Sequence, residues 1–251
     1  MLQEPFSEGV SPIHRLAPVP RISAAIIGAV CLSLIRQPES ALAALGIAAF
    51  MLALSAPPPL PLLRRLAVVN LFVLLLWLTV PFTTSGEEVM KLGPLAVTRQ
   101  GMTLAWLVSL KVNALVMLFL ALVATMSIPA LGAALKKLGL PDRLTALLLF
   151  SYRYIHVIGA EWNRLYTAAR LRGFAPRTDR WTYKTVGTLL GMLFVRSVKR
   201  AGRIHEAMRL RGFSGRFYML DDDAAKLPDI LFAAALALAC AVPLCWEVFH
   251  G

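Results

Sequence analysis

The run LAVVNLFVLLLWLTVPF, from Leu66 to Phe82, decides the fold class of this chain. It contains no charged residue and one amide side chain, Asn70. A helix that crosses a bilayer needs about 20 mostly apolar residues, and about 17 is the lower end of the range. The run therefore predicts a transmembrane helix.

The composition of the whole chain agrees with a membrane protein. Of its 251 residues, 58% are hydrophobic and 16% are charged, against about 25% charged in an ordinary soluble domain. The mean hydropathy is +0.67, yet the formal net charge is +12. Such a chain is typical of a membrane protein whose basic residues gather on one side. Nucleic-acid binding is disfavoured because the basic segments lie between apolar runs long enough to span a bilayer.

Four further runs predict spans, at 22–35, 39–56, 101–128 and 228–249. The first is short, so either it borrows residues 19–21 or it pairs with the second as a hairpin that does not fully cross. Pro129 is expected to end the fourth run. The predicted fold class is all-α, a polytopic membrane protein with about five transmembrane helices and long amphipathic cytoplasmic helices.

The distribution of charge predicts the orientation. With the N-terminus inside, 22 Lys and Arg residues fall on the inside and 3 on the outside. The positive-inside rule then places the N-terminus in the cytoplasm and the C-terminus outside. The chain is divided into a membrane region with four spans (1–128), a cytoplasmic-side region (129–227) and a last span (228–251). The early residues Glu4 and Glu8 argue against a cleaved signal peptide.

The cytoplasmic region is not a hydrophilic domain. It contains apolar stretches at 144–158 and 186–195, each too short or too interrupted by charge to be a confident span. We expect long amphipathic helices packed under the spans, with the question of whether 144–158 enters the bilayer left open. Alternatively, the two stretches pair with each other as a partial span.

An internal repeat marks this region. The sequence AARLRGF at 168–174 recurs as AMRLRGF at 207–213, with six of the seven positions identical. Two copies are too few for a solenoid. They suggest that one chain presents the same feature twice, as it would to a partner with two-fold symmetry.

Each copy is predicted to end a helix. Upstream, apolar or small residues recur every three or four positions and mark one helix face: Ile155, Ile158, Trp162, Leu165 and Ala169 in the first copy, and Ser197, Ala201, Ile204 and Met208 in the second. Three residues further along these stripes lie Arg172 and Arg211. Gly173 and Gly212 follow, in the position where helices commonly end with a left-handed residue.

The phenylalanines Phe174 and Phe213 are expected to supply the hydrophobic contact that closes such a cap. Arginine at the end of each stripe is suited to bind carboxylates and carbonyls in a groove, because its guanidinium is a planar fork of donors. Two plainer explanations remain. Arginine near a helix C-terminus is favoured by the helix dipole, by about 0.3–1 kcal/mol, and basic residues under a membrane bind lipid phosphates.

These features resemble the transmembrane (T) component of energy-coupling factor transporters, closest to the cobalt-type CbiQ members. The resemblance also rests on SPIHRL at 11–16, LGLP at 138–141 and YRY at 152–154. Residues 17–21 depart from the family pattern, since they lack an expected acidic residue and one basic residue.

The resemblance implies two coupling helices that dock in grooves of a dimer of ATP-binding-cassette ATPases. Each ends in a short X-Arg-X motif, and the residues concerned are Leu171, Arg172, Gly173, Leu210, Arg211 and Gly212, supported by Ala169, Met208, Phe174 and Phe213. The chain would then be the coupling subunit of an ATP-driven importer for cobalt ions in the inner membrane of a prokaryote. Its other partner would be a substrate-binding membrane subunit.

No catalytic residues, cofactor or metal site are assigned to this chain. It lacks the phosphate loop G-x-x-x-x-G-K-[ST], so ATP and Mg²⁺ are expected to be used by the partner ATPases. The four histidines are dispersed, without the clustering that a metal site needs. The acidic run 221–223 is expected to be a solvated turn.

Two other function classes stay open. A stand-alone secondary carrier or channel would need polar linings in several spans and would pass solute without ATP. A membrane-bound enzyme or lipid-binding scaffold would use the basic cytoplasmic surface. Within the fourth run, Lys111 and Asn113 either face a substrate-binding partner, or Lys111 extends toward the membrane surface or pairs with a backbone carbonyl inside the bundle.

Overall fold

The computed structural model of the chain describes residues 11–92, 95–213 and 227–250. The acidic run 221–223 lies outside these residues. The chain divides into two compact units. The described part of the larger unit covers residues up to Leu138 together with 227–250, and that of the smaller unit covers 139–213.

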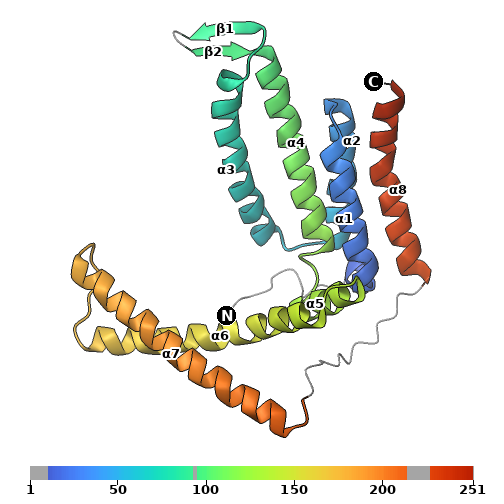
Figure 1. Cartoon of the computed structure of the whole chain (residues 1–251). Helices are drawn as coiled ribbons and strands as arrows, with labels where there is room; N and C mark the ends of the chain where they lie inside the picture. Colours follow the sequence, from blue (N-terminus) through green and yellow to red (C-terminus); the bar gives the residue numbers. More distant parts are fainter. Residues whose placement is uncertain (1–10, 93–94, 214–226, 251) are drawn as a thin grey trace. The chain divides into compact units, whose positions relative to one another are not determined.

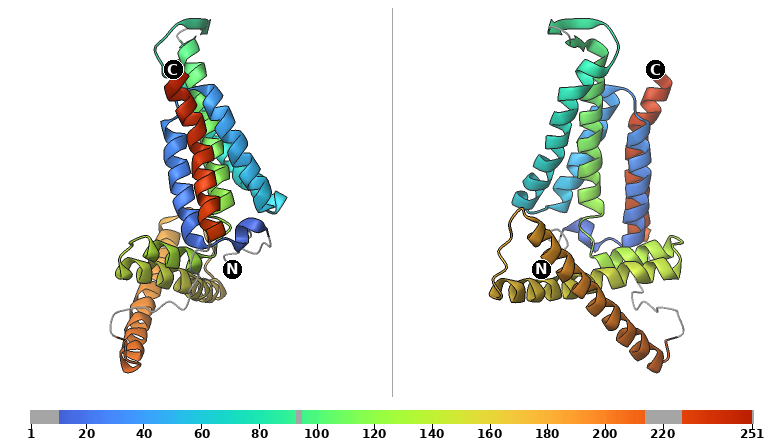
Figure 2. Two further views of the ribbon diagram at one scale, coloured as in Figure 1. Left: turned by 90° about the vertical axis from the view of Figure 1, so that its right-hand side faces the viewer. Right: turned by 60° about the vertical axis from the view of Figure 1, so that its left-hand side comes forward.

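The larger unit is a bundle of helices with a short hairpin. Its elements are the 3-10 helix η1 (Pro12–Arg15), α1 (Pro18–Leu34), α2 (Pro38–Ser55), α3 (Pro59–Thr83), β1 (Glu88–Leu92), β2 (Leu95–Thr98), α4 (Arg99–Leu122), α5 (Ile128–Lys137) and α8 (Leu227–His250). Helices α1, α2, α4 and α8 run side by side in both views (Figures 1 and 2). Helices α2, α3, α4 and α8 are long and apolar enough to cross a membrane, and α1 is a shorter apolar helix. The predicted polytopic helical membrane fold is confirmed.

Small side chains bring α2 and α4 together. On α2, Ala41, Ala44 and Ala48 form one buried stripe, and Ala114 and Ala121 on α4 are fully buried. In a membrane the hydrophobic effect drives helices together only weakly, so close backbone approach over small residues is a main source of association. The alanine spacing of these helices therefore determines which faces meet.

Gly28 allows a similar approach of α1 to α4 and α8. A Cβ at this position would lie 2.7 Å from Cδ2 of Leu118 and 3.5 Å from Sγ of Cys240. A larger residue at position 28 would have to displace the side chain of Leu118, whereas the 3.5 Å distance to Cys240 is an ordinary contact.

Helix α3 packs mainly on α4 and is joined to it by polar contacts. The amides of Asn70 and Asn113 donate to each other's oxygens at 3.2 and 3.3 Å, and Nε1 of Trp77 donates to Oγ of Ser109 at 2.9 Å. Pro81 is the one described residue of α3 that is buried. Most of its other residues are exposed, and a minority on the face toward α4 are half-buried.

Three features of the bundle differ from the sequence expectations. Helix α3 begins at Pro59, seven residues before the predicted run 66–82, because proline is well suited to the first helical position. The fourth run ends earlier, at Leu122, and Pro129 lies in the first turn of α5 instead of ending a span. The antiparallel hairpin of β1 and β2, which joins α3 to α4, is an addition to the predicted all-helical chain.

The start of α5 has a local cause. Ser127 is its N-cap, and the Ser127 hydroxyl accepts a hydrogen bond from the amide of Ala130 at 3.4 Å. Serine at the cap followed by proline in the first turn is a strong start signal for a helix. The chain therefore starts a new helix here after the turn that closes α4.

The smaller unit contains α6 (Asp142–Leu171) and α7 (Arg180–Leu210), of 30 and 31 residues. The predicted apolar stretches 144–158 and 186–195 each lie within one of these long helices. Helix α7 crosses α6 (Figure 1). Much of their apolar surface stays exposed, as for Leu147 and Phe194, whose exposed fractions are 65% and 70%.

Candidate coupling site

The first copy of the repeat closes the C-terminus of α6. Arg172 is the capping residue, with φ −90° and ψ 15°, and Gly173 follows with φ +86°. The amide of Phe174 donates to the carbonyl of Ala169 at 3.1 Å, and the amide of Gly173 donates to that of Arg170 at 3.0 Å. This pair of hydrogen bonds is a Schellman cap, which requires a left-handed residue where Gly173 stands.

The second copy repeats this geometry at the end of α7. Arg211 has φ −90° and ψ 13°, and Gly212 has φ +79°. The amide of Phe213 donates to the carbonyl of Met208 at 3.1 Å, and the amide of Gly212 donates to that of Arg209 at 3.0 Å. The predicted left-handed glycine caps are therefore confirmed at both helix ends.

Both helix ends present an apolar side chain beside a guanidinium. Leu171 and Leu210 have exposed fractions of 86% and 90%, and the adjacent Arg172 and Arg211 are also exposed. A Cβ on either cap glycine would have no neighbour within 4 Å. Each helix end therefore presents an exposed leucine and an exposed arginine side by side.

The first cap is braced by a chain of aromatic rings. Phe174 is 5% exposed, and its ring centroid lies 6.1 Å from that of Tyr166 and 5.6 Å from that of Trp181 at the start of α7. Tyr166 in turn stacks on Trp162 at 6.2 Å. The expected hydrophobic contact of Phe174 is thus made, and it joins the end of α6 to the beginning of α7.

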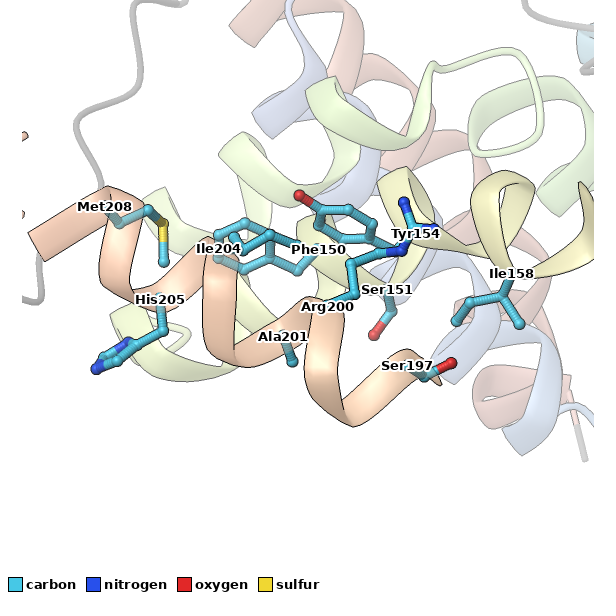
Figure 3. A pocket seen from close by; sticks show the side chains of 10 residues that line it. All are labelled: Phe150, Ser151, Tyr154, Ile158, Ser197, Arg200, Ala201, Ile204, His205 and Met208. Carbon is cyan, nitrogen blue, oxygen red and sulfur yellow. The ribbon is translucent and has the colours of Figure 1, made fainter. Parts of the chain in front are cut away.

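The two stripes of residues that lead to Arg172 and Arg211 differ in their surroundings. On α6, Leu165 is buried, whereas Ile155 and Ile158 remain exposed. On α7, the whole predicted stripe lines a groove that α7 forms with α6, together with four residues of α6 (Figure 3). These stripe residues are Ser197, Ala201, Ile204 and Met208.

Glu161 holds the crossing of α6 and α7, a role that the sequence analysis missed. Its carboxylate accepts a hydrogen bond from Arg196 on α7 and lies 4.0 Å from Arg200 and 3.5 Å from Arg164. The hydrogen bond from Arg196 is the main cause that lowers the pKa of Glu161. A sequence signal existed, since Glu161 is the one acidic residue between positions 143 and 178.

Lys111 pairs with backbone carbonyls inside the bundle, which is one of the roles expected from the sequence. Its ammonium donates to the carbonyls of Ser33 and Ile35 at 2.7 Å each, at the C-terminal end of α1. The adjacent polar residue Asn113 pairs with Asn70 of α3. Lys111 and Asn113 are therefore both engaged within the bundle.

Metal ligands do not gather in the described residues: no three His, Cys, Asp or Glu side chains lie together there.

Comparison with known proteins identifies the family of this chain. Residues 9–219 match the CbiQ family, described as cobalt transport protein. The energy-coupling factor transporter transmembrane protein EcfT of Acidaminococcus fermentans is 27% identical over 93% of this chain and 89% of its own length. The nickel permease LarQ of Lactiplantibacillus plantarum is 33% identical over 34% of this chain and 30% of its own.

The family match covers both helix ends, the membrane helices α1 to α4, and the residues of the N-terminal SPIHRL segment from position 11. The resemblance stated from the sequence is therefore confirmed at the level of the family. The chain belongs to the CbiQ family of cobalt transport proteins.

Proposed function

We propose that this chain is the transmembrane coupling subunit of an ATP-driven importer of the energy-coupling factor type. It links an ATPase dimer to a separate substrate-binding membrane subunit and has no catalytic site of its own. The family match and the full-length similarity to an EcfT protein support this proposal. The names of the relatives, cobalt transport protein and nickel permease, favour a divalent transition-metal ion as the solute, and cobalt is our first choice.

The observation that carries the proposal is the pair of matching helix ends. Two helices of nearly equal length each finish in an exposed leucine, an exposed arginine and a left-handed glycine. An ATPase dimer offers two equivalent sites, and one chain with two equivalent tips can occupy both. A single basic helix end would be explained by the helix dipole or by lipid; two with the same backbone geometry point to a two-fold partner.

In this mechanism Arg172 and Arg211 hold the two tips in the two ATPase subunits. ATP binding brings the subunits together, so the distance between the tips changes. Helices α6 and α7, held together at Glu161, carry that change toward the membrane spans and the substrate-binding subunit. The tips must contact the ATPases differently in the open and closed states, because a ligand shifts an equilibrium only by its differential affinity.

The proposal includes an orientation. With 22 Lys and Arg residues on the N-terminal side of the membrane against 3 on the other, the N-terminus and the α6–α7 unit are cytoplasmic, where ATP is available.

The test is the double variant Arg172→Ala/Arg211→Ala. Loss of one buried, hydrogen-bonded arginine at an interface costs about 2–5 kcal/mol, so removal of both should release the ATPases during co-purification. The matched control is Arg170→Ala/Arg209→Ala, which removes the same charge two positions earlier on the same helices, on a different face of each. Retention of wild-type amounts of ATPase by the first variant, or equal loss in the control, would refute the proposal.

The solute is tested separately. We expect ATP-dependent uptake of cobalt or nickel into liposomes only when the ATPases and the substrate-binding subunit are present. Flux through this chain alone, without ATP, would instead identify a stand-alone carrier or channel.

A further inference from the structure

A groove with about 390 Å³ of open space lies between α6 and α7 (Figure 3). Its size falls within the usual range of small-molecule sites. Its walls are apolar: Phe150 and Ile158 contribute from α6, and Ala201, Ile204 and Met208 contribute from α7. A groove of this kind suits a hydrocarbon chain.

Cationic groups lie at the same groove. Arg200 is one of its lining residues. On the α6 side, Tyr154 also lines the groove, and the guanidinium carbon of Arg153 lies 5.9 Å from the centroid of the Tyr154 ring. The nearby carboxylate of Glu161 is shared by three arginines, so the surroundings stay positive. Arginine binds phosphate oxygens strongly because its donors match their geometry.

The whole α6–α7 unit has the character of an interfacial surface. Between Asp142 and Arg211 the chain carries 14 Lys and Arg residues and 4 Asp and Glu residues. Large apolar side chains remain exposed on the same two helices, among them Leu147, Phe194 and Val198. Basic amphipathic helices with exposed apolar residues bind anionic membranes through both properties.

We propose that this groove binds one anionic phospholipid, with an acyl chain between Phe150 and Ile204 and the phosphate at Arg200. The apolar walls alone would accept any lipid, and the arginine selects a negatively charged headgroup. This inference does not rest on the proposed function, because it concerns the space between α6 and α7 and not the helix ends.

The experiment uses the full chain, purified in detergent and offered equal amounts of phosphatidylglycerol and phosphatidylcholine. Native mass spectrometry counts the lipid that remains bound. We expect one retained phosphatidylglycerol, and about a tenfold loss of its bound fraction in Arg200→Gln, since one charge-assisted hydrogen bond is removed. Ala201→Phe should abolish retention by filling the groove. Met208→Trp blocks the same groove from another position and replaces Ala201→Phe if that variant is not monodisperse.

Two controls separate this site from general attraction to a basic surface. Arg203→Gln removes the same charge from α7 outside the groove. Arg164→Gln, like Arg200→Gln, removes an arginine that neighbours Glu161, but Arg164 does not line the groove. Both should retain phosphatidylglycerol like the wild type. No preference for phosphatidylglycerol, an equal loss in either control, or full retention with the groove filled would each overturn the proposal. An equal loss in a control would indicate general attraction to a basic surface, and full retention with the groove filled would indicate that the lipid binds outside the groove.

Discussion

Arg21 and Lys111 cap each other's helices. Arg21, near the start of α1, donates from Nη2 to the carbonyl of Leu122 at the end of α4, at 2.8 Å. Lys111, in α4, donates from Nζ to the carbonyls of Ser33 and Ile35 at the end of α1. The last carbonyls of a helix lack partners within it and need donors from elsewhere. Two antiparallel helices thus satisfy each other's C-termini.

We expect Lys111→Met to destabilise the bundle by about 1–3 kcal/mol, because the carbonyls of Ser33 and Ile35 lose their donor. The melting temperature in detergent should fall. Lys111→Arg keeps a donor of similar reach and should restore most of the loss. A Lys111→Met protein with the melting temperature of the wild type would show that the hydrogen bonds of Lys111 do not stabilise the bundle.

The two caps should act independently. Lys111 and Leu122 are separated by 11 residues of α4, about 16 Å along the helix, and the two caps share no partner. The destabilisation of Arg21→Met/Lys111→Met should therefore equal the sum of the single variants within about 0.5 kcal/mol. A larger discrepancy in the double-mutant cycle would mean that the two ends of α1 are coupled.

Gly173→Ala and Gly212→Ala should loosen their helix ends to the same degree. Each glycine has a left-handed φ, which costs an L-residue about 1–2 kcal/mol, and no atom lies within 4 Å of a new Cβ, so the effect is one of backbone conformation alone. Amide hydrogen exchange of the last turn should accelerate about 5- to 30-fold.

The control for this pair is Gly187→Ala, inside α7. Position 187 also has open space but lacks the left-handed φ. Alanine there should slow exchange, since it favours the helix by about 0.5–1 kcal/mol. The same sign of effect at positions 187 and 212 would contradict the conformational explanation.

Asn70→Ala and Asn113→Ala should show a coupling energy in a double-mutant cycle. Their amides form a reciprocal pair between α3 and α4, and such pairs in membranes average about 0.6 kcal/mol, with a maximum of about 1.7. Thr79→Ala is the comparison, because its hydroxyl bonds only to carbonyls of its own helix. It should show no coupling to Asn113.

Glu161→Gln should loosen the crossing of α6 and α7. The pKa of Glu161 is lowered in the folded state from an ordinary value of 4.5, so its contribution is complete above that value and is lost as the pH falls through the lowered folded value. The distance between spin labels at Thr167 and Thr188 can be measured in a background without native cysteines. At pH 7 the distance distribution should be broader for Glu161→Gln than for the protein with Glu161. With Glu161 present, the distribution should broaden only in strong acid. Glu206→Gln removes an equal charge from α7 and should leave the distribution narrow.

The sequence was sufficient for features that depend on neighbouring residues. The second run was expected at 39–56 and α2 is observed at Pro38–Ser55, because an apolar run between prolines is a local signal. The glycine caps of α6 and α7 were predicted in the same way, from a stripe that ends in arginine and glycine.

Features that depend on distant pairing were missed. Arg21 is 2% exposed and bonds to a carbonyl 101 positions away, although the sequence shows only an arginine at the edge of an apolar run. The partners of Glu161 on α7 likewise become visible only when the two helices cross. The end of α4 was misplaced because the Ser127 and Pro129 start signal lies inside a continuous apolar run.

The unequal burial of α3 and α4 has a consequence for variation among relatives. Ala114 and Ala121 have no accessible surface, so even an added methyl group at these positions must displace the atoms packed around it. On α3, Leu71, Phe72 and Leu78 are more than half exposed, and any residue that lipid tolerates can replace them. Inherited changes should therefore accumulate on α3 and remain rare along the alanine positions of α4, and a library of random substitutions should recover the same contrast.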